Sequence, residues 1–192
     1  MGCYVPPWPR DRTGCARSAR ALPEGMETLL WLERTAPSVW LRESGPGFFG
    51  SLIFHALGMA FLVGAHLARD LRILGVAPAV PLSSMRALRP VARAGLGVVG
   101  VSGVALLIAY PTKALTNPLF HGKLLALVLA LAVGRAITNR WLATPERDAT
   151  PLPSLARAAA AVSLLLWAGA ITSGRLLAYT YQVLLAADVY PP

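Results

Sequence analysis

Long apolar stretches alternate with short, arginine-rich connections along most of this chain. The clearest stretch covers residues 48–67, which carry no formal charge and end abruptly at Arg69, Asp70 and Arg72. A helix of about 20 apolar residues is long enough to cross the hydrocarbon core of a bilayer. The pattern therefore predicts an all-α integral membrane protein, a bundle of four transmembrane helices over residues of about 48–68, 91–110, 119–138 and 156–178.

The segment that precedes the first span is too polar to cross a membrane. Over residues 26–45 leucine, valine and tryptophan alternate with glutamate and arginine, and Pro37 divides the segment in two. Amphipathic helices of this kind lie in the membrane surface. We therefore expect a short N-terminal interfacial helical segment, with Trp31 and Trp40 at the level of the lipid headgroups.

Both ends of the chain are expected to lie outside the membrane domain. Residues 1–25 are rich in proline, glycine and arginine, and they lack the apolar core of a signal peptide. We interpret them either as a disordered tail or as an upstream translation that precedes a true start at Met26. The membrane domain then covers residues 46–182, and residues 183–192 form a C-terminal tail. Both cysteines fall in the first segment, without the spacing of a zinc site.

The composition supports a lipid environment and argues against a nucleic-acid partner. Of the 192 residues, 55% are hydrophobic and only 14% are charged, which lies outside the range of soluble domains. The net charge of +9 comes largely from arginines at the ends of apolar spans, where they anchor and orient helices. The two arginine-rich connections follow the first and third spans. The positive-inside rule therefore places both of them in the cytoplasm and both termini outside.

Polar side chains within the spans are the candidates for function, because the bilayer core tolerates them only with partners. In the predicted topology the outer half of the bundle gathers four basic residues and no acidic one: His55, His121, Lys123 and Arg175. An imidazole can ligate haem iron, and Lys or Arg can pair with the haem propionates. The same donors suit the carbonyl oxygens of a quinone. The sequence thus predicts binding of haem b or a quinone for electron transfer, with His55 as candidate iron ligand and His121 as candidate second ligand.

Each of these residues also has a purely structural interpretation. His55 can join two helices through a hydrogen bond, and His121 can be solvated at the interface. Lys123 and Arg175 can both extend to the headgroups. His66 lies about 16 Å from His55 along a helix axis, so it belongs to a different depth and more simply bonds locally.

The cytoplasmic ends of the spans carry a second charged group, for which we favour a structural role. Here Asp70 stands among Arg69, Arg72, Arg135 and Arg140, and we expect it to pair with one of these arginines and fix the topology. The spans contain no carboxylate at mid-depth that could orient a histidine, so no catalytic residue of a hydrolase is predicted. An enzymatic role is at most that of a redox protein.

A cofactor-free role is the alternative, as an accessory or assembly subunit or a small permease. Its basis is the small residues on two spans, which allow helices to approach closely. They are Ala56, Ala60, Gly64 and Ala68 on the first span and Gly95, Gly97 and Gly100 on the second. These faces are candidates for self-association or for docking a partner.

Three strings of the chain resemble an uncharacterised family of small four-helix bacterial inner-membrane proteins, known only as a domain of unknown function. They are HALGMAFLVGAHLARDLRILG, FHGKLLALVLALAVGR and SLLLWAGAITSGRLLAY, and the resemblance covers residues 26–179. It implies a multi-pass protein of the bacterial inner membrane with the four-helix topology predicted above, so that the outer termini are periplasmic. The haem or quinone hypothesis adds a membrane or periplasmic redox partner, and the small-residue faces add a homo-oligomer.

The family is itself distantly similar to the copper-resistance D proteins and to the HemJ-type protoporphyrinogen oxidases. In HemJ-type proteins a histidine on the first helix and a lysine on the third are associated with haem b. His55 and Lys123 stand at comparable positions in this chain. The resemblance therefore implies a haem-binding role for this pair.

Overall fold

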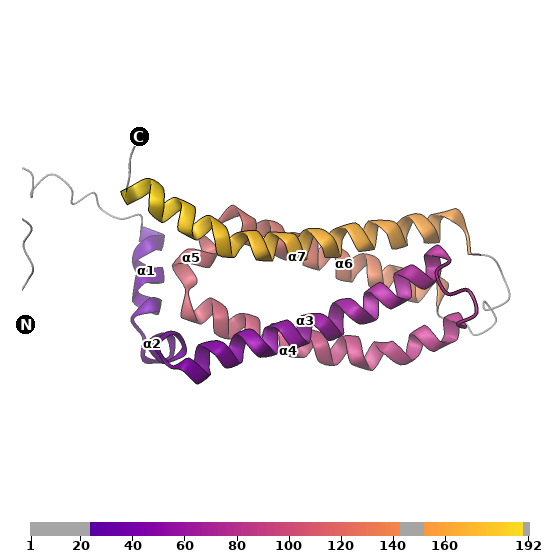
Figure 1. Ribbon diagram of the computed structural model, residues 1–192, viewed down its shortest axis with the longest axis horizontal. Coiled ribbons are helices and arrows are strands. Elements are labelled where there is room, and N and C mark those ends of the chain that lie inside the picture. The colour runs from indigo at the N-terminus through magenta and orange to yellow at the C-terminus, as the bar shows by residue number, and fades with distance from the viewer. Residues whose placement is uncertain (1–23, 143–151, 190–192) are drawn as a thin grey trace, which may run out of the picture.

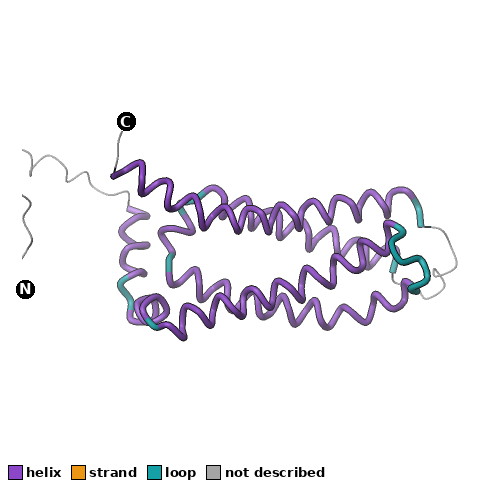
Figure 2. The backbone as a smooth tube through the Cα atoms, in the orientation of Figure 1, coloured by secondary structure: helices purple, strands orange, loops and turns teal. Residues whose placement is uncertain are grey.

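The protein is built from helices and short connections, as the prediction of an all-α fold required (Figures 1 and 2). The computed structural model describes residues 24–142 and 152–189, and none of them forms a strand. Along the chain lie α1 (Glu24–Glu33), α2 (Ala36–Glu43), α3 (Gly45–Leu74), the 3-10 helix η1 (Leu82–Leu88), α4 (Arg89–Ala109), α5 (Pro111–Leu115), α6 (Pro118–Trp141) and α7 (Ser154–Val189). The hypotheses about residues 1–25 fall almost wholly outside the described residues.

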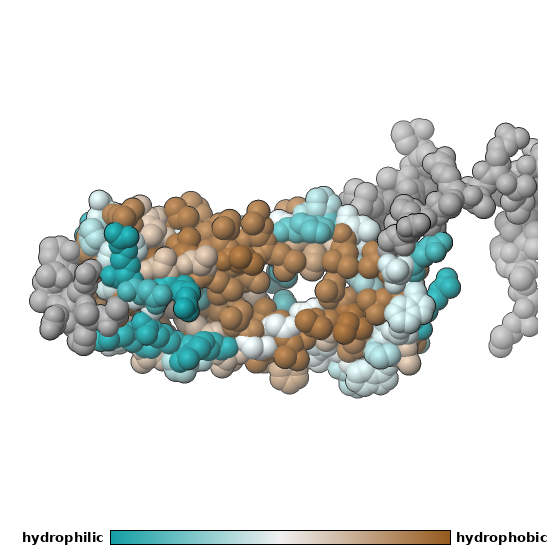
Figure 3. All heavy atoms as spheres, turned by 180° about the vertical axis from the view of Figure 1, so that it is seen from behind, coloured by the Kyte–Doolittle hydropathy of each residue, from teal (hydrophilic) through white to brown (hydrophobic). Residues whose placement is uncertain are grey.

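Four of the described helices are long and apolar enough to cross a membrane. They cover Gly45–Leu74, Leu82–Ala109, Pro118–Trp141 and Ser154–Leu177. Their outward faces carry large exposed apolar side chains, among them Phe54, Val101 and Leu165, and hydrophobic atoms cover much of the bundle in Figure 3. So much exposed apolar surface is stable only against lipid or another apolar partner. The fold is therefore that of a multi-pass membrane protein.

Local sequence signals fix where the long helices begin and end. The Ser44 hydroxyl accepts a hydrogen bond from the Gly47 amide at 3.1 Å, and the Asn117 side chain accepts one from the Leu119 amide at 2.9 Å. Each capping residue satisfies an amide of the first turn of its helix, α3 or α6, and a proline follows it within two positions. At the other end of α3 the chain leaves through Gly75, whose φ of 99° favours glycine.

The four long helices pack as two close pairs. α3 packs along α4 and α6 along α7, and the two pairs meet mainly through α3 and α7 (Figure 1). The α3–α4 pair is closely packed at Gly95. A Cβ at this position would lie only 2.7 Å from the Leu62 amide nitrogen and 2.9 Å from the Gly58 carbonyl oxygen. Two glycines thus let the backbones of α3 and α4 approach closely.

The small-residue stripe predicted on the first span takes no part in this contact. Its four members, Ala56, Ala60, Gly64 and Ala68, are all exposed on α3, and a Cβ on Gly64 would meet nothing within 4 Å. Gly97 of α4 likewise faces open space. The close approach uses Gly58 and Gly95 instead.

The two short N-terminal helices lie across one end of the bundle (Figure 1). The Glu33 carboxylate of α1 accepts a hydrogen bond from the Thr112 amide at 3.2 Å, in the first turn of α5. The Arg42 guanidinium of α2 donates to the carbonyl oxygens of Glu33 at 3.4 Å and Ala109 at 3.5 Å. Side chains of α1 and α2 therefore satisfy backbone groups at the corner where α4 meets α5, and they attach these helices to the bundle.

We expect Gly95→Ala to lower the stability of the protein by about 1–3 kcal/mol, because the new methyl group would collide with the backbone of α3. Thermal unfolding in detergent, followed by circular dichroism, measures the change. Gly97→Ala adds the same methyl group on the same helix in open space and is the matched control. Equal unfolding temperatures for the two variants would contradict the close approach of α3 and α4.

Candidate functional site

His55 lies on α3 and is held by Ser102 of α4. Its Nδ1 lies 3.1 Å from the Ser102 hydroxyl oxygen, and that hydroxyl also lies 2.6 Å from the Val98 carbonyl oxygen. A hydroxyl has one hydrogen to donate, and a carbonyl oxygen can only accept. When the hydroxyl donates to Val98, it must accept from Nδ1 of His55. The proton of a neutral His55 then sits on Nδ1, and Nε2 keeps its lone pair.

Lys123 of α6 joins His55 across the bundle. Both side chains are half-buried, and they are close enough for their charges to interact. The Lys123 side chain packs against α7 at Gly174, where a Cβ would lie 3.5 Å from Cε and from Nζ. The two residues thus belong to different helix pairs, His55 to α3–α4 and Lys123 to α6–α7. Figure 3 shows the bundle hollowed between the two pairs, with hydrophilic atoms visible in the opening.

The other two residues predicted for this cluster lie differently. His121 is exposed, and its Nδ1 lies 3.2 Å from the carbonyl oxygen of Asn117, one turn earlier in the chain. Arg175 is also exposed, next to Gly174 on α7. The structure thus brings His55 and Lys123 near each other and leaves His121 and Arg175 exposed.

A buried ion pair occupies the opposite half of the bundle. The Arg69 Nη2 and Nε lie 2.6 Å and 2.8 Å from Oδ1 of Asp70, and both side chains are almost completely buried. Arg69 also donates to the Gly134 carbonyl oxygen of α6 at 3.0 Å and reaches Thr138 at 3.5 Å. On the other side, the Asp70 carboxylate faces the Ser163 hydroxyl of α7. The pair therefore joins α3 to α6 by hydrogen bonds and lies against Ser163 of α7.

Arg72, the third residue assigned a structural role, serves the connection after α3. It donates to the carbonyl oxygen of Pro78 at 2.9 Å and to that of Val80. These bonds fix the loop that leads from α3 into η1. Arg72 thus holds a connection, whereas Arg69 holds the helices together.

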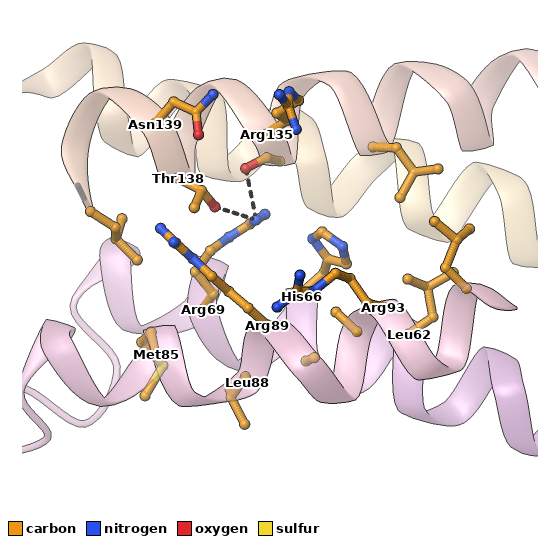
Figure 4. Close-up of a pocket in the computed structure, with 16 residues that line it drawn as sticks. Leu62, His66, Arg69, Met85, Leu88, Arg89, Arg93, Arg135, Thr138 and Asn139 are labelled. Carbon is orange, nitrogen blue, oxygen red and sulfur yellow. Dashed lines mark hydrogen bonds between the residues drawn. The ribbon is translucent and has the colours of Figure 1, made fainter.

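Beside the ion pair a cavity of about 430 Å³ lies between α3, α4 with η1, and α6 (Figure 4). Four arginines and a histidine line it together with apolar side chains: His66, Arg69, Arg89, Arg93 and Arg135. In Figure 4 the side chains of His66, Arg69, Arg89 and Arg93 extend into the space between α4 and α6. The His66 ring lies 5.1 Å from that of the buried Trp167, and its Nδ1 has no hydrogen-bond partner among the described residues.

This cavity is the site that reasoning from the sequence missed. The positive-inside rule explains arginines at cytoplasmic helix ends as anchors, so it gives Arg89 and Arg93 no further role. The spacing of Arg89 and Arg93 could have indicated a shared site, because residues four apart lie on the same face of a helix. That this face meets Arg69 and Arg135 across a cavity depends on helix packing.

The fold and these two sites define a class, that of helical multi-pass membrane proteins with basic groups inside the bundle. The chain matches no protein-family model, no curated protein sequence and no solved structure.

We expect Asp70→Asn to destabilise the protein by about 3–5 kcal/mol, because it leaves the buried charge of Arg69 without a counter-charge. Unfolding in detergent, monitored by circular dichroism, measures the loss. The double variant Arg69→Met/Asp70→Leu removes both charges and should recover a large part of the stability. If the double variant were as unstable as Asp70→Asn, the uncompensated charge would not be the cause.

Proposed function

We propose that this protein is a membrane-embedded electron-transfer protein that binds b-type haem through His55. The observation that carries the proposal is the hydrogen bond between His55 and Ser102. It holds the ring between two helices and leaves Nε2 as the nitrogen with a free lone pair. A histidine ligand of a metal typically has its other ring nitrogen bonded in this way.

The surroundings of His55 fit an iron porphyrin with acidic side groups. Lys123 supplies a half-buried cation next to the histidine, and Arg175 supplies an exposed one beside Gly174. Carboxylates of a bound porphyrin would be neutralised by these cations. Haem bound at this place would supply reversible one-electron chemistry within the bilayer. A quinone headgroup is the second cofactor that suits the pair, with Lys123 donating to a carbonyl oxygen.

The orientation and the family are part of the same proposal. We infer a bacterial inner-membrane protein with both termini in the periplasm, because the arginines concentrate at the end of the bundle that carries η1. The position of His55 and Lys123 on the first and third membrane helices supports the relationship to the four-helix family and to HemJ-type proteins. A membrane or periplasmic redox partner would then exchange electrons with the site.

We expect the purified protein, expressed with ample haem, to show a Soret band and sharp α and β bands after reduction with dithionite. His55→Ala should abolish these bands, because it removes the proposed iron ligand. His121→Ala is the matched control, since this histidine is exposed and bonds within its own helix. Ser102→Ala keeps the ligand but removes its hydrogen bond, so it should shift the reduction potential while retaining the spectrum.

A flat visible spectrum of the wild-type protein would contradict haem binding. Extraction and chromatography of bound lipids then separate the two cofactors, because a bound quinone would be recovered from the wild-type protein and lost from Lys123→Ala. Absence of both cofactors would refute the proposal.

A second candidate function is that of a cofactor-free accessory subunit, and the exposed small-residue stripe of α3 favours it. Small residues on a lipid-facing surface allow another membrane helix to pack closely. In this role the stripe would bind a partner subunit or a second copy of the chain.

We expect Gly64→Leu to abolish self-association or complex formation if the stripe is an interface, while the fold remains intact because this position faces open space. Cross-linking in membranes measures association. Gly169→Leu, also at a glycine with open space around it, is the control on another helix. Under this second function His55→Ala should leave association unchanged, and loss of association only in His55→Ala would instead favour a cofactor role.

A further inference from the structure

We propose that the arginine-lined cavity between α3, α4 and α6 binds the phosphate headgroup of an anionic phospholipid. It is a second site, independent of the proposed electron-transfer function, because its residues are separate from His55 and Lys123. The cavity measures about 430 Å³, which is within the range of ligand pockets.

The charges that line the cavity favour an anion. Asp70 is the only carboxylate between residues 44 and 142, and its Oδ1 is bound by Arg69. The three remaining arginines of the lining, Arg89, Arg93 and Arg135, are exposed, and none of them is in an ion pair within the described residues. Guanidinium groups bind phosphate through several parallel hydrogen bonds. Three of them around one cavity therefore favour a phosphate over a single carboxylate.

The order of polar and apolar residues along the cavity fits an amphiphile rather than a free ion. Three of the lining leucines lie nearer the middle of a span than the lining arginine of the same helix: Leu62 before Arg69 on α3, Leu96 after Arg93 on α4, and Leu131 before Arg135 on α6. Two others, Leu88 and Leu142, lie toward the helix ends. The arginines thus lie nearer the headgroups than the three inner leucines, which lie at the level of the acyl chains. Basic pockets of this kind between membrane helices bind anionic lipid headgroups.

A lipid could reach the cavity from the side. α4 and α6 both line it, yet they are not among the helix pairs that pack closely. The inner wall, in contrast, is closely packed, because a Cβ on Gly134 would lie 2.9 Å from His66 Cε1 and 3.0 Å from Arg69 Nη1. The buried Nδ1 of His66, which has no partner among the described residues, is a further polar atom at this wall. The site therefore has a closely packed inner wall on α3 and α6 and an opening toward lipid between α4 and α6.

The experiment is a titration of the purified full-length protein in detergent with phosphatidylglycerol, followed by native mass spectrometry. Phosphatidylcholine with the same acyl chains is the comparison lipid. We expect phosphatidylglycerol to bind more tightly, and Arg89→Gln/Arg93→Gln to weaken it on the order of 10-fold or more. Arg140→Gln/Arg157→Gln is the matched control, because it removes the same charge from exposed positions outside the lining, on α6 and near the start of α7. Circular dichroism verifies that both double variants fold.

Three results would overturn the proposal. Equal weakening in the two double variants would show a diffuse effect of charge rather than a site. Equal affinity for phosphatidylcholine would show that anionic character is not recognised. Displacement of phosphatidylglycerol by inorganic phosphate at a comparable concentration would show a site for a free anion. None of these outcomes depends on haem, so the proposal fails or stands separately from the proposed function.

Discussion

The bundle depends on one buried ion pair, that of Arg69 and Asp70. Two adjacent residues of α3 bring a positive and a negative charge into an apolar interior, where each would be very costly alone. Arg69 reaches α6 through the Gly134 carbonyl, and Asp70 lies near Ser163 of α7. α3 also packs tightly on α4, so the pair lies on the helix that contacts the other long helices.

The ion pair also explains why the neighbouring cavity is so basic. The charge of Asp70 is already balanced by Arg69. The other arginines that line the cavity therefore have no carboxylate partner among the described residues. Leaving several guanidinium groups around one space is unfavourable unless water solvates them or an anion neutralises their charge. A membrane surface rich in anionic lipid supplies such a group at this depth. The same helix ends can thus orient the protein and recognise a lipid.

The opposite half of the bundle is organised by weaker, hydrogen-bonded contacts. His55 is held by a hydrogen bond to Ser102, and α1 and α2 are attached through Glu33 and Arg42 to backbone groups at the corner of α4 and α5. The α3–α4 and α6–α7 pairs leave a hollow between them near this half (Figure 3). A site with spare space beside a half-buried histidine and lysine is suited to a cofactor, whereas the inner half is suited to holding the helices together.

The sequence by itself determined the helical class, the four apolar spans and the pairing of Asp70 with an arginine, because length, hydropathy and the cost of a lone buried charge act locally. It also placed His55 and Lys123 at one depth, since a helix converts residue number into height. Rotation about each helix axis was decided only by tertiary packing. That rotation left His121 and Arg175 exposed, selected Gly58 and Gly95 over the more regular stripe at Gly64, and placed Arg89 and Arg93 in the lining of a cavity. In a lipid environment both faces of such a helix can be apolar, so hydrophobic periodicity does not reveal which face meets its neighbours.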